Sequence, residues 1–429
     1  MSTAGDPTVR AIEPLTGPID AVVMVPGSKS ISNRALIGAA LAEGESTIVG
    51  ALDADDTEAM IQCLRRLGRD VRADGDTLFV SGGSFQAGPM LLDARLSGTT
   101  ARFLLPALSL GEGRYTVDGR PPLRARPMHD LVVALRTLGV RVDEDGEPGH
   151  LPLTVTGGGS TGGTVRVRGD VTSQYLSALL LSGPRFEKGL VVDVTGGLVS
   201  RPYVELTIAV MADLGVVVEA TGSGWRVPPA AYRPATLAVE PDASAASYFF
   251  AAAAICGGRV TVPGLHRDSV QGDAHFVDIL RAMGATVEER ASGLSVHGTR
   301  GLRGGEFDLR DMPDMAQTLA VVAAFADGPT TVKGVGFIRG HETDRIAAVV
   351  RELKRCGIEA TEEPDGFVVK PGRIITGATI ETYDDHRMAM SFALLGLRVP
   401  GIGIANPECA AKTFPGYWDA LDGMRGRRG

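Results

Sequence analysis

The sequence has few aromatic residues, few cysteines and no long hydrophobic run. Aromatic residues make up 5% of its 429 positions, and its cysteines, Cys63, Cys256, Cys356 and Cys409, form no CxxC pair and lie near no histidine pair. This spacing disfavours a zinc site and a disulfide framework, so we expect buried thiols in a reducing compartment. The most apolar stretch, residues 245–256, is far shorter than the roughly 20 residues that span a bilayer.

The sequence also lacks a basic excess, because its formal net charge is -8. A general nucleic-acid binder needs a basic face to neutralise phosphates, so that class is disfavoured, whereas a small anion held by local cations is not. The first residues, MSTAGDPTVRAIEPLTG, show no basic segment followed by an apolar core, so no secretory signal is predicted. We expect a folded, cytoplasmic protein with no nucleic-acid or membrane partner.

One six-residue motif recurs about every seventy residues. It reads CLRRLG, ALRTLG, VMADLG, ILRAMG and ELKRCG, and it closes on Gly68, Gly139, Gly215, Gly284 and Gly357. Each glycine follows an amphipathic run and precedes an alternating one, which is typical of a helix closed by a C′ glycine before a strand. A strand, an Ala/Leu-rich helix and another strand precede each of these helices. The predicted unit is therefore βαβαββ.

Six copies of this unit predict two α/β domains of three units, because one hydrophobic core rarely extends over so long a chain. We expect the first copy to begin with a strand in residues 21–27 and the fourth with a strand in residues 236–242. The sixth copy, from residue 378, is expected to end after its second helix. The Pro-rich residues 227–237, between the third and fourth copies, predict the boundary.

The unusual charges lie where the first strand of each copy runs into its Ala/Leu-rich helix. These turns span residues 26–34, 95–102, 169–175, 240–247, 310–317 and 383–390. Ser, Thr or Asp at a helix start is ordinarily a cap, but a cap needs no cation, and the turns contain Lys29, Arg34, Arg102 and Arg387. Cations beside helix N–H groups favour phosphate or carboxylate. PGSKSISNR lacks the first P-loop glycine, and no turn carries GxGxxG, so nucleotide sites are not predicted.

Several polar residues leave capping, solvation and function open. GHETDR, residues 340–345, gathers more charge at a helix start than a capping box needs. Asp314 in DMPDM and Asp242 in PDAS each follow a proline, where aspartate often caps a helix. Arg124 and Arg126 in RPPLRARP are compatible with solvated loop charges.

Seven segments, PGSKSISNRAL, SGTTAR, TSQYLSALLL, PDASAASYF, GHETDR, DDHRMAM and KTFPGYW, occur in order from about residue 25 to residue 418. Together they resemble the 5-enolpyruvylshikimate-3-phosphate (EPSP) synthases, the enolpyruvyl transferases of the shikimate pathway. The resemblance implies an α/β fold of two domains, each of three βαβαββ repeats around a pseudo-threefold axis, with substrates in the cleft. It also implies that residues 1–20 join residues 240–429 in one domain and that residues 21–239 form the other.

The resemblance implies transfer of the enolpyruvyl group of phosphoenolpyruvate to the 5-hydroxyl of shikimate 3-phosphate, with release of phosphate, on the route to chorismate and the aromatic amino acids. It implies a monomer that needs no metal or other cofactor. The implied shikimate 3-phosphate ligands are Lys29, Ser30, Arg34, Thr172, Ser173, Gln174, Ser200, Tyr203, Asp314 and His341. The implied phosphoenolpyruvate ligands are Lys29, Gly98, Arg126, Gln174, Arg345, Arg387 and Lys412. Asp314 is the expected base and Glu342 the expected acid, with Lys29 near both, and Gly98 followed by Thr99 implies sensitivity to glyphosate.

The sequence departs from the family pattern at three positions: Leu96 and Phe337 stand where many members have Asn, and His341 where many have Lys. Particular residues disfavour two alternative functions. UDP-N-acetylglucosamine enolpyruvyl transferases carry a Lys-Asn pair near the N-terminus and usually a cysteine in the loop matching residues 120–127, whereas here Ser30 follows Lys29 and that loop has no cysteine. A non-catalytic phosphoanion-binding paralogue would be expected to lose its acid and base, but Asp314 and Glu342 are present.

Overall fold

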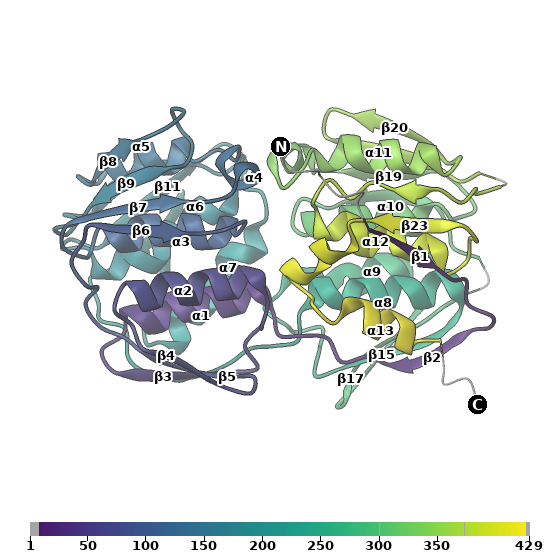
Figure 1. Cartoon of the computed structure of the whole chain (residues 1–429), viewed down its shortest axis with the longest axis horizontal. Helices are drawn as coiled ribbons and strands as arrows, with labels where there is room; N and C mark the ends of the chain where they lie inside the picture. Colours follow the sequence, from purple (N-terminus) through teal and green to yellow (C-terminus); the bar gives the residue numbers. More distant parts are fainter. Residues whose placement is uncertain (1–7, 300, 373, 426–429) are drawn as a thin grey trace. The chain divides into compact units, whose positions relative to one another are not determined.

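The structure is a computed structural model that describes residues 8–299, 301–372 and 374–425 (Figure 1). The chain divides into two compact units: unit 1 comprises Met1–Val25 and Pro241–Gly429, and unit 2 comprises Pro26–Glu240. The sequence placed the corresponding boundaries after residues 20 and 239. The ends of the predicted discontinuous domain, residues 1–7 and 426–429, lie outside the described residues.

Unit 2 contains three four-stranded sheets, with the strand orders β14-β3-β5-β4, β6-β7-β9-β8 and β10-β11-β13-β12. Its strands are β3 Glu45–Val49, β4 Val71–Asp74, β5 Thr77–Ser81, β6 Met90–Asp93, β7 Arg114–Asp118, β8 Arg141–Glu144, β9 Leu153–Thr156, β10 Gly163–Arg168, β11 Leu190–Thr195, β12 Glu219–Ala220, β13 Gly224–Val227 and β14 Thr236–Ala238. Its helices are α1 Lys29–Leu41, α2 Asp55–Arg66, α3 Gly98–Leu108, α4 Pro121–Arg124, α5 His129–Thr137, α6 Ser173–Ser182, α7 Arg201–Asp213 and the 3₁₀ helix η1 Gly183–Arg185. In the second sheet, β6 is parallel to β7, and β9 is antiparallel to both β7 and β8, as the βαβαββ unit predicts.

The described residues of unit 1 form sheets with the orders β16-β17-β15-β2, β18-β19-β21-β20 and β1-β23-β22. Its strands are β1 Val9–Ile12, β2 Ile19–Val22, β15 Gly258–Pro263, β16 Thr286–Arg290, β17 Gly293–His297, β18 Gly305–Asp308, β19 Thr330–Lys333, β20 Glu359–Glu363, β21 Gly366–Lys370, β22 Thr379–Ile380 and β23 Ile402–Ala405. Its helices are α8 Ala243–Cys256, α9 Phe276–Ala282, α10 Ala316–Ala323, α11 Arg345–Arg355, α12 His386–Gly396, α13 Tyr417–Gly423 and the 3₁₀ helices η2 Gly272–His275, η3 Pro313–Met315, η4 Gly336–Gly340 and η5 Pro407–Lys412.

The first strands of the first and fourth copies are exchanged, because each pairs in the sheet of the other copy. Strand β2, which precedes α1, lies parallel to β15 in unit 1 with Ala21 opposite Val260 (Figure 1). Strand β14, which precedes α8, lies parallel to β3 in unit 2 with Leu237 opposite Ile48. Equivalent strands of two copies have similar alternating patterns, so either can occupy the same edge, and the chain passes between the units twice as a result.

The sixth copy is shorter than the others, as predicted, but the N-terminal strand extends its sheet. Strands β22 and β23 are parallel and flank α12 in the chain, and η5 and α13 follow. Strand β1 pairs antiparallel with β23, with Val9 opposite Ala405. The N-terminal segment thus supplies the antiparallel neighbour that a hairpin strand supplies in the other copies.

The five glycines that define the repeat end their helices as predicted. Each has a positive φ, from 76° at Gly357 to 113° at Gly284, which a residue without a Cβ adopts at little cost. After α2, the Arg69 amide donates to the Leu64 carbonyl at 2.9 Å and the Gly68 amide to the Arg65 carbonyl at 3.0 Å, the two bonds of a Schellman motif. The same local structure therefore turns the chain from helix to strand in each of the first five copies.

The Ala/Leu-rich helices form the centre of each unit: α1, α3 and α6 lie in the core of unit 2, and α8, α10 and α12 in that of unit 1. Every residue of α3 is buried, and most of α8 is buried too, which explains why the Ala-rich sequence of α8 is apolar on most sides rather than amphipathic. Cys63 and Cys356 are buried as expected, whereas Cys256 and Cys409 are half-buried. Among the described residues, no helix is both long and apolar enough to cross a bilayer.

Candidate functional site

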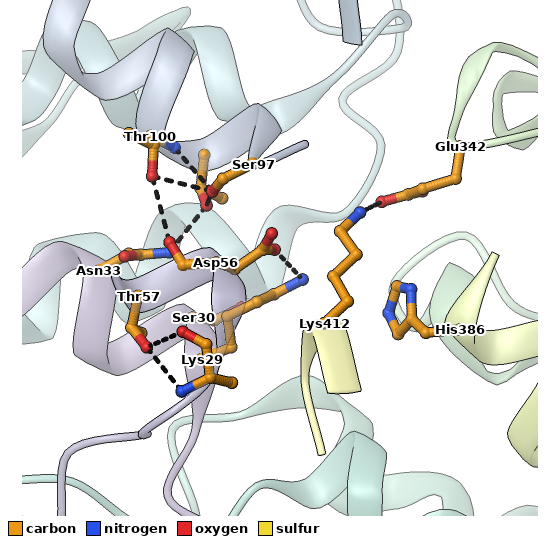
Figure 2. A network of polar contacts seen from close by, with 12 residues as sticks. Lys29, Ser30, Asn33, Asp56, Thr57, Ser97, Thr100, Glu342, His386 and Lys412 are labelled. Atoms are coloured by element: carbon orange, nitrogen blue, oxygen red, sulfur yellow. Dashed lines mark hydrogen bonds and ion pairs between the residues drawn. The ribbon is translucent and has the colours of Figure 1, made fainter. Parts of the chain in front are cut away.

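The first predicted turn places Lys29 at the start of α1 (Figure 2). The Ser28 side chain caps this helix by accepting a hydrogen bond from the Ile31 amide. The Lys29 ammonium lies 3.4 Å from a carboxylate oxygen of Asp56, in the first turn of α2, and the two side chains are 15% and 4% exposed. This largely buried pair holds a cation beside the N–H groups at the start of α1, where an anion would also be favoured.

Arg34 is fully buried one turn further along α1, and all three guanidinium nitrogens donate within unit 2. Nε donates to Thr207 Oγ1 at 2.7 Å, Nη1 to the Ser30 carbonyl at 2.8 Å, and Nη2 to the Tyr203 carbonyl at 3.1 Å and Ser177 Oγ at 3.2 Å. Burial lowers the pKa of Arg34 to about 10, with Tyr203 opposing the shift, so the side chain stays charged at neutral pH. Arg34 therefore ties α1 to α6 and α7.

A chain of hydroxyl groups connects α1 to the start of α3 (Figure 2). Asn33 Nδ2 donates to Thr99 Oγ1 at 2.8 Å, and that hydroxyl lies 3.2 Å from Ser97 Oγ. Ser97 caps α3 and accepts from both the amide and the hydroxyl of Thr100. The second predicted turn is thus held against the first by buried hydrogen bonds.

Gly98 and Arg126, predicted to bind the same substrate, are in direct contact. A Cβ atom on Gly98 would lie 2.5 Å from Arg126 Nη1 and 2.9 Å from Cζ. The Arg126 side chain is buried at 6% exposure, so the open question of a solvated loop charge is answered in favour of a held cation. Only glycine lets the guanidinium approach the first residue of α3 this closely.

The third predicted turn places Thr172, Ser173 and Gln174 at the start of α6. Thr172 is the cap and accepts from the Gln174 amide at 3.2 Å, while Ser173 is buried. Gln174 Oε1 accepts a 2.7 Å hydrogen bond from Arg102 Nη1, so the amide oxygen faces α3. Arg102, the cation singled out in the second turn, therefore orients Gln174.

Ser200 adopts a left-handed conformation, with φ 55° and ψ 41°, immediately before α7. A non-glycine residue in this region costs on the order of 1 kcal/mol, and such residues cluster at functional sites. Ser200 is buried, and its carbonyl accepts from the Tyr203 amide at 3.1 Å. The turn thus holds both predicted ligands at the start of one helix.

In unit 1, Arg345 is the centre of a buried cluster formed by Arg345, Arg387, Lys412, Asp314, Glu342 and Asp385, here called the cation–carboxylate cluster. The Nε atom of Arg345 lies 2.7 Å from Asp385 Oδ2. Its Nη1 atom lies 2.8 Å from Asp314 Oδ1, and its Nη2 atom lies 2.9 Å from Glu342 Oε2. Burial alone would lower the pKa of Arg345, but these three carboxylates outweigh it and raise the pKa. The guanidinium is permanently charged.

Asp314 bridges two arginines. Oδ1 accepts from Arg345 Nη1 at 2.8 Å, and Oδ2 accepts from Arg387 Nη2 at 2.6 Å. Asp314 occupies neither N-cap position nearby, because Met312 precedes η3 and Met315 precedes α10. The capping role that the sequence left open for Asp314 is therefore not the one it fills.

Glu342 bridges Arg345 and the third cation of the cluster: Oε2 contacts Arg345, and Oε1 accepts from Lys412 Nζ at 2.9 Å (Figure 2). Lys412 ends η5 and is 7% exposed. Arg387, the second residue of α12, also donates from Nη1 to the Tyr248 hydroxyl at 3.3 Å. Both carboxylates predicted for acid-base work are thus held between two cations predicted for substrate.

The departures at positions 337 and 341 are neighbours. His341 Nδ1 lies 3.2 Å from Arg345 Nη1, and its ring meets the Phe337 ring edge-on with centroids 5.9 Å apart. A guanidinium can only donate, so this contact requires Nδ1 of His341 to be the acceptor. Leu96 is half-buried next to the cap Ser97.

The sequence reasoning missed the anionic partners of its cations. Asp56 pairs with Lys29, and Asp385 contacts Arg345 and caps α12 through the Arg387 amide at 2.9 Å. The acidic start of α2, DDTE, and the DDHR string could have indicated both. Asp242, left open between two roles, caps α8 by accepting from the Ala245 amide at 2.8 Å. No group of three or more His, Cys, Asp or Glu within the described ranges is arranged to hold a metal ion.

Two solved structures with the same fold indicate the class of protein to which this chain belongs. The structure superposes on the enolpyruvyl transferase NikO from Streptomyces tendae with a TM-score of 0.78, 20% identity and coverage of 98% of both chains, a likeness of fold alone. It also superposes on an EPSP synthase from Acinetobacter baumannii with a TM-score of 0.81 and 28% identity, covering 97% of this chain and 98% of the other. The predicted fold class, the α/β fold of the enolpyruvyl transferases with its repeated units, is confirmed.

Sequence relatives then identify the family. The model of the EPSP synthase (3-phosphoshikimate 1-carboxyvinyltransferase) family matches residues 14–421. A 3-phosphoshikimate 1-carboxyvinyltransferase from Nostoc punctiforme is 45% identical over 418 residues, 95% of this chain and 97% of the relative. One from Paraburkholderia phytofirmans is 44% identical over 417 residues, 94% of this chain and 96% of the relative. The chain belongs to the EPSP synthase family.

Proposed function

We infer that this chain is a 3-phosphoshikimate 1-carboxyvinyltransferase, which transfers the enolpyruvyl group of phosphoenolpyruvate to the 5-hydroxyl of shikimate 3-phosphate. The 5-hydroxyl oxygen adds to C2 of phosphoenolpyruvate while C3 takes up a proton, and the adduct then loses phosphate and a methyl proton. The observation that carries this assignment is the cation–carboxylate cluster, which combines anion ligands with two carboxylates able to move protons.

Three cations and three carboxylates balance one another in the cation–carboxylate cluster, so binding and chemistry are coupled. An anionic substrate that takes hydrogen bonds from Arg387 or Lys412 competes with Asp314 or Glu342 for them. A carboxylate released in this way becomes available to accept or return a proton. Binding of phosphoenolpyruvate by Arg345, Arg387 and Lys412 thus prepares Asp314 to act as base and Glu342 as acid.

Residues of unit 2 complete the proposed ligand sets. Lys29 is assigned to both substrates, and Gly98, Arg126 and Gln174 to phosphoenolpyruvate, with the contact between Gly98 and the Arg126 guanidinium as support. Ser30, Thr172, Ser173, Gln174, Ser200 and Tyr203 are assigned to shikimate 3-phosphate together with Asp314 and His341. Arg34 stays in this set, but its internal hydrogen bonds favour a supporting role in which it fixes the backbone of Ser30 and Tyr203.

The two compact units support the predicted division into two domains, one of them discontinuous because the chain passes between the units twice. We assign the chain to the cytoplasm as a monomer that acts on small molecules, because the family's substrates are products of intracellular metabolism.

The function is tested by phosphate release from purified protein mixed with phosphoenolpyruvate and shikimate 3-phosphate. Turnover should require both substrates. UDP-N-acetylglucosamine in place of shikimate 3-phosphate tests the related transferase activity and should release no phosphate. Binding of both substrates without phosphate release would refute catalysis and favour a non-catalytic paralogue.

A further inference from the structure

A fourth carboxyl group, Asp273, lies near Arg387. It belongs to η2, is 4% exposed, and accepts a hydrogen bond at Oδ2 from the Ser244 hydroxyl in the first turn of α8. Ser244 Oγ in turn lies 3.5 Å from Arg387 Nη2, the nitrogen that donates to Asp314. Asp273, Ser244, Arg387 and Asp314 therefore form one continuous polar chain.

The direction of these hydrogen bonds lets Asp273 affect the interaction between Ser244 and Arg387. A serine hydroxyl has one proton and two lone pairs, so a hydroxyl that donates to Asp273 presents lone pairs to Arg387. Without an acceptor at position 273, the Ser244 hydroxyl can rotate and point its proton toward the positively charged guanidinium. The hydroxyl proton and the guanidinium then repel each other. The acceptor thus determines whether Ser244 attracts Arg387.

The segment that carries Asp273 is firmly attached to the start of α8. Gln271 Nε2 donates to the Pro241 carbonyl at 2.9 Å, and Gln271 Oε1 accepts from the Ala243 amide at 3.1 Å. These two bonds lie on either side of the cap residue Asp242. Gln271 and Asp273 together hydrogen-bond the turn that faces Arg387, so several contacts fix the position of Ser244.

We propose that Asp273 is a positioning residue for the transferase reaction, which aligns the Arg387 guanidinium with substrate and Asp314 through the Ser244 hydroxyl. The proposal rests on the proposed function, because it takes Arg387 as a ligand of phosphoenolpyruvate. Asp273 does this as a neutral acid. An ionised Asp273 would add a fourth carboxylate beside the balanced cation–carboxylate cluster and would oppose an anionic substrate.

Burial, reinforced by the charge of Asp314, raises the pKa of Asp273 to about 7, although Arg387 and the bond from Ser244 lower it. The charged groups that face it are Asp314 from η3, Arg387 from α12 and Asp242 from the start of α8. His275, on η2 itself, is half-exposed and pairs with Asp278 instead. The acid is therefore protonated below neutral pH and ionises above it.

The test compares Asp273→Asn and Asp273→Ala with wild type in the steady-state release of phosphate, from about pH 6 to about pH 9. Asparagine keeps the acceptor and cannot ionise, so its KM for phosphoenolpyruvate should match wild type at low pH and rise less with pH. Alanine removes the acceptor and should raise this KM about 10- to 150-fold at every pH, the effect of losing a hydrogen bond to a charged group. Ser244→Ala should match Asp273→Ala at low pH, where Asp273 is neutral. The control is Asp268→Asn, an exposed carboxylate on the same segment, which should keep the wild-type profile.

A crystal structure of Asp273→Ala supplies a readout that does not depend on turnover. We expect the Arg387 guanidinium to shift or to take alternate positions. The proposal is overturned if Arg387 stays in place and the KM stays at the wild-type value, or if asparagine impairs the enzyme as much as alanine does. Absence of phosphate release from wild type would instead refute the proposed function, and the crystal structure would still decide whether Asp273 positions Arg387.

Discussion

Replacing Asp314 by asparagine separates its chemical role from its structural one. Asparagine keeps the shape and one oxygen acceptor but loses the charge, so it can satisfy Arg345 or Arg387 but not both. Arg345 retains Asp385 and Glu342, and the Asp314 side chain is 19% exposed, so the loss amounts to about one charged hydrogen bond. We expect the free energy of unfolding to fall by about 1 to 3 kcal/mol. If Asp314 is the base, kcat should fall by about 10²- to 10⁴-fold, equivalent to about 3 to 5 kcal/mol of barrier.

The assay combines phosphate release at saturating substrates, calorimetric binding of shikimate 3-phosphate and denaturant unfolding. The matched control is Asp344→Asn, because Asp344 caps α11 beside Arg345 and asparagine caps a helix as well as aspartate does. It should change kcat less than about threefold. The reasoning fails if Asp314→Asn keeps kcat within about tenfold of wild type while stability drops by 3 kcal/mol or more, as expected of a structural ion pair alone.

Two further predictions concern Gly98 and Asp273. Gly98→Ala should displace the Arg126 guanidinium, so KM for phosphoenolpyruvate and the inhibition constant for glyphosate should both rise in steady-state assays, and unchanged values of both would contradict the contact. For Asp273 the folded pKa of about 7 exceeds the ordinary 3.8, so its contribution to stability is complete below about pH 4 and is lost as pH rises through 7. Denaturant unfolding at several pH values should show this loss of unfolding free energy, at most about 4 kcal/mol, in wild type but not in Asp273→Asn. If the unfolding free energies of the two proteins change equally with pH, the raised pKa of Asp273 is refuted.

Features determined by short stretches of sequence were predictable. Ser28, Ser97 and Thr172 cap the helices that their turns begin, and Gly68 and Gly139 end theirs with positive φ. Each of these structures depends on hydrogen bonds within about six residues, so the residue types alone specify them. The seventy-residue repeat followed from the same local signals.

Pairing between distant segments was not predictable from pattern. Strands β2 and β14 are both short and both alternate buried and exposed residues. No residue within either strand indicates that it pairs in the sheet of the other copy. The resemblance to a family implied the discontinuous domain, whereas the repeat analysis did not. The partners of the cations were hidden for the same reason, since Arg345 and Asp385 are 40 positions apart in the chain.

The charge balance of the cation–carboxylate cluster also explains why Asp385 and Asp273, which are not proposed as substrate ligands, still matter. In the proposed mechanism, Asp314 and Glu342 neutralise the cations without substrate and lose these hydrogen bonds when an anion binds, so binding releases the groups that move protons. Asp385 differs, because it is completely buried and also caps α12, so we expect it to stay on Arg345 when substrate binds. A further negative charge at Asp273 would disturb this balance, because Arg387 would then face two carboxylates and a substrate anion at once. A neutral acid at position 273 avoids that conflict and still supplies the oxygen that orients Ser244.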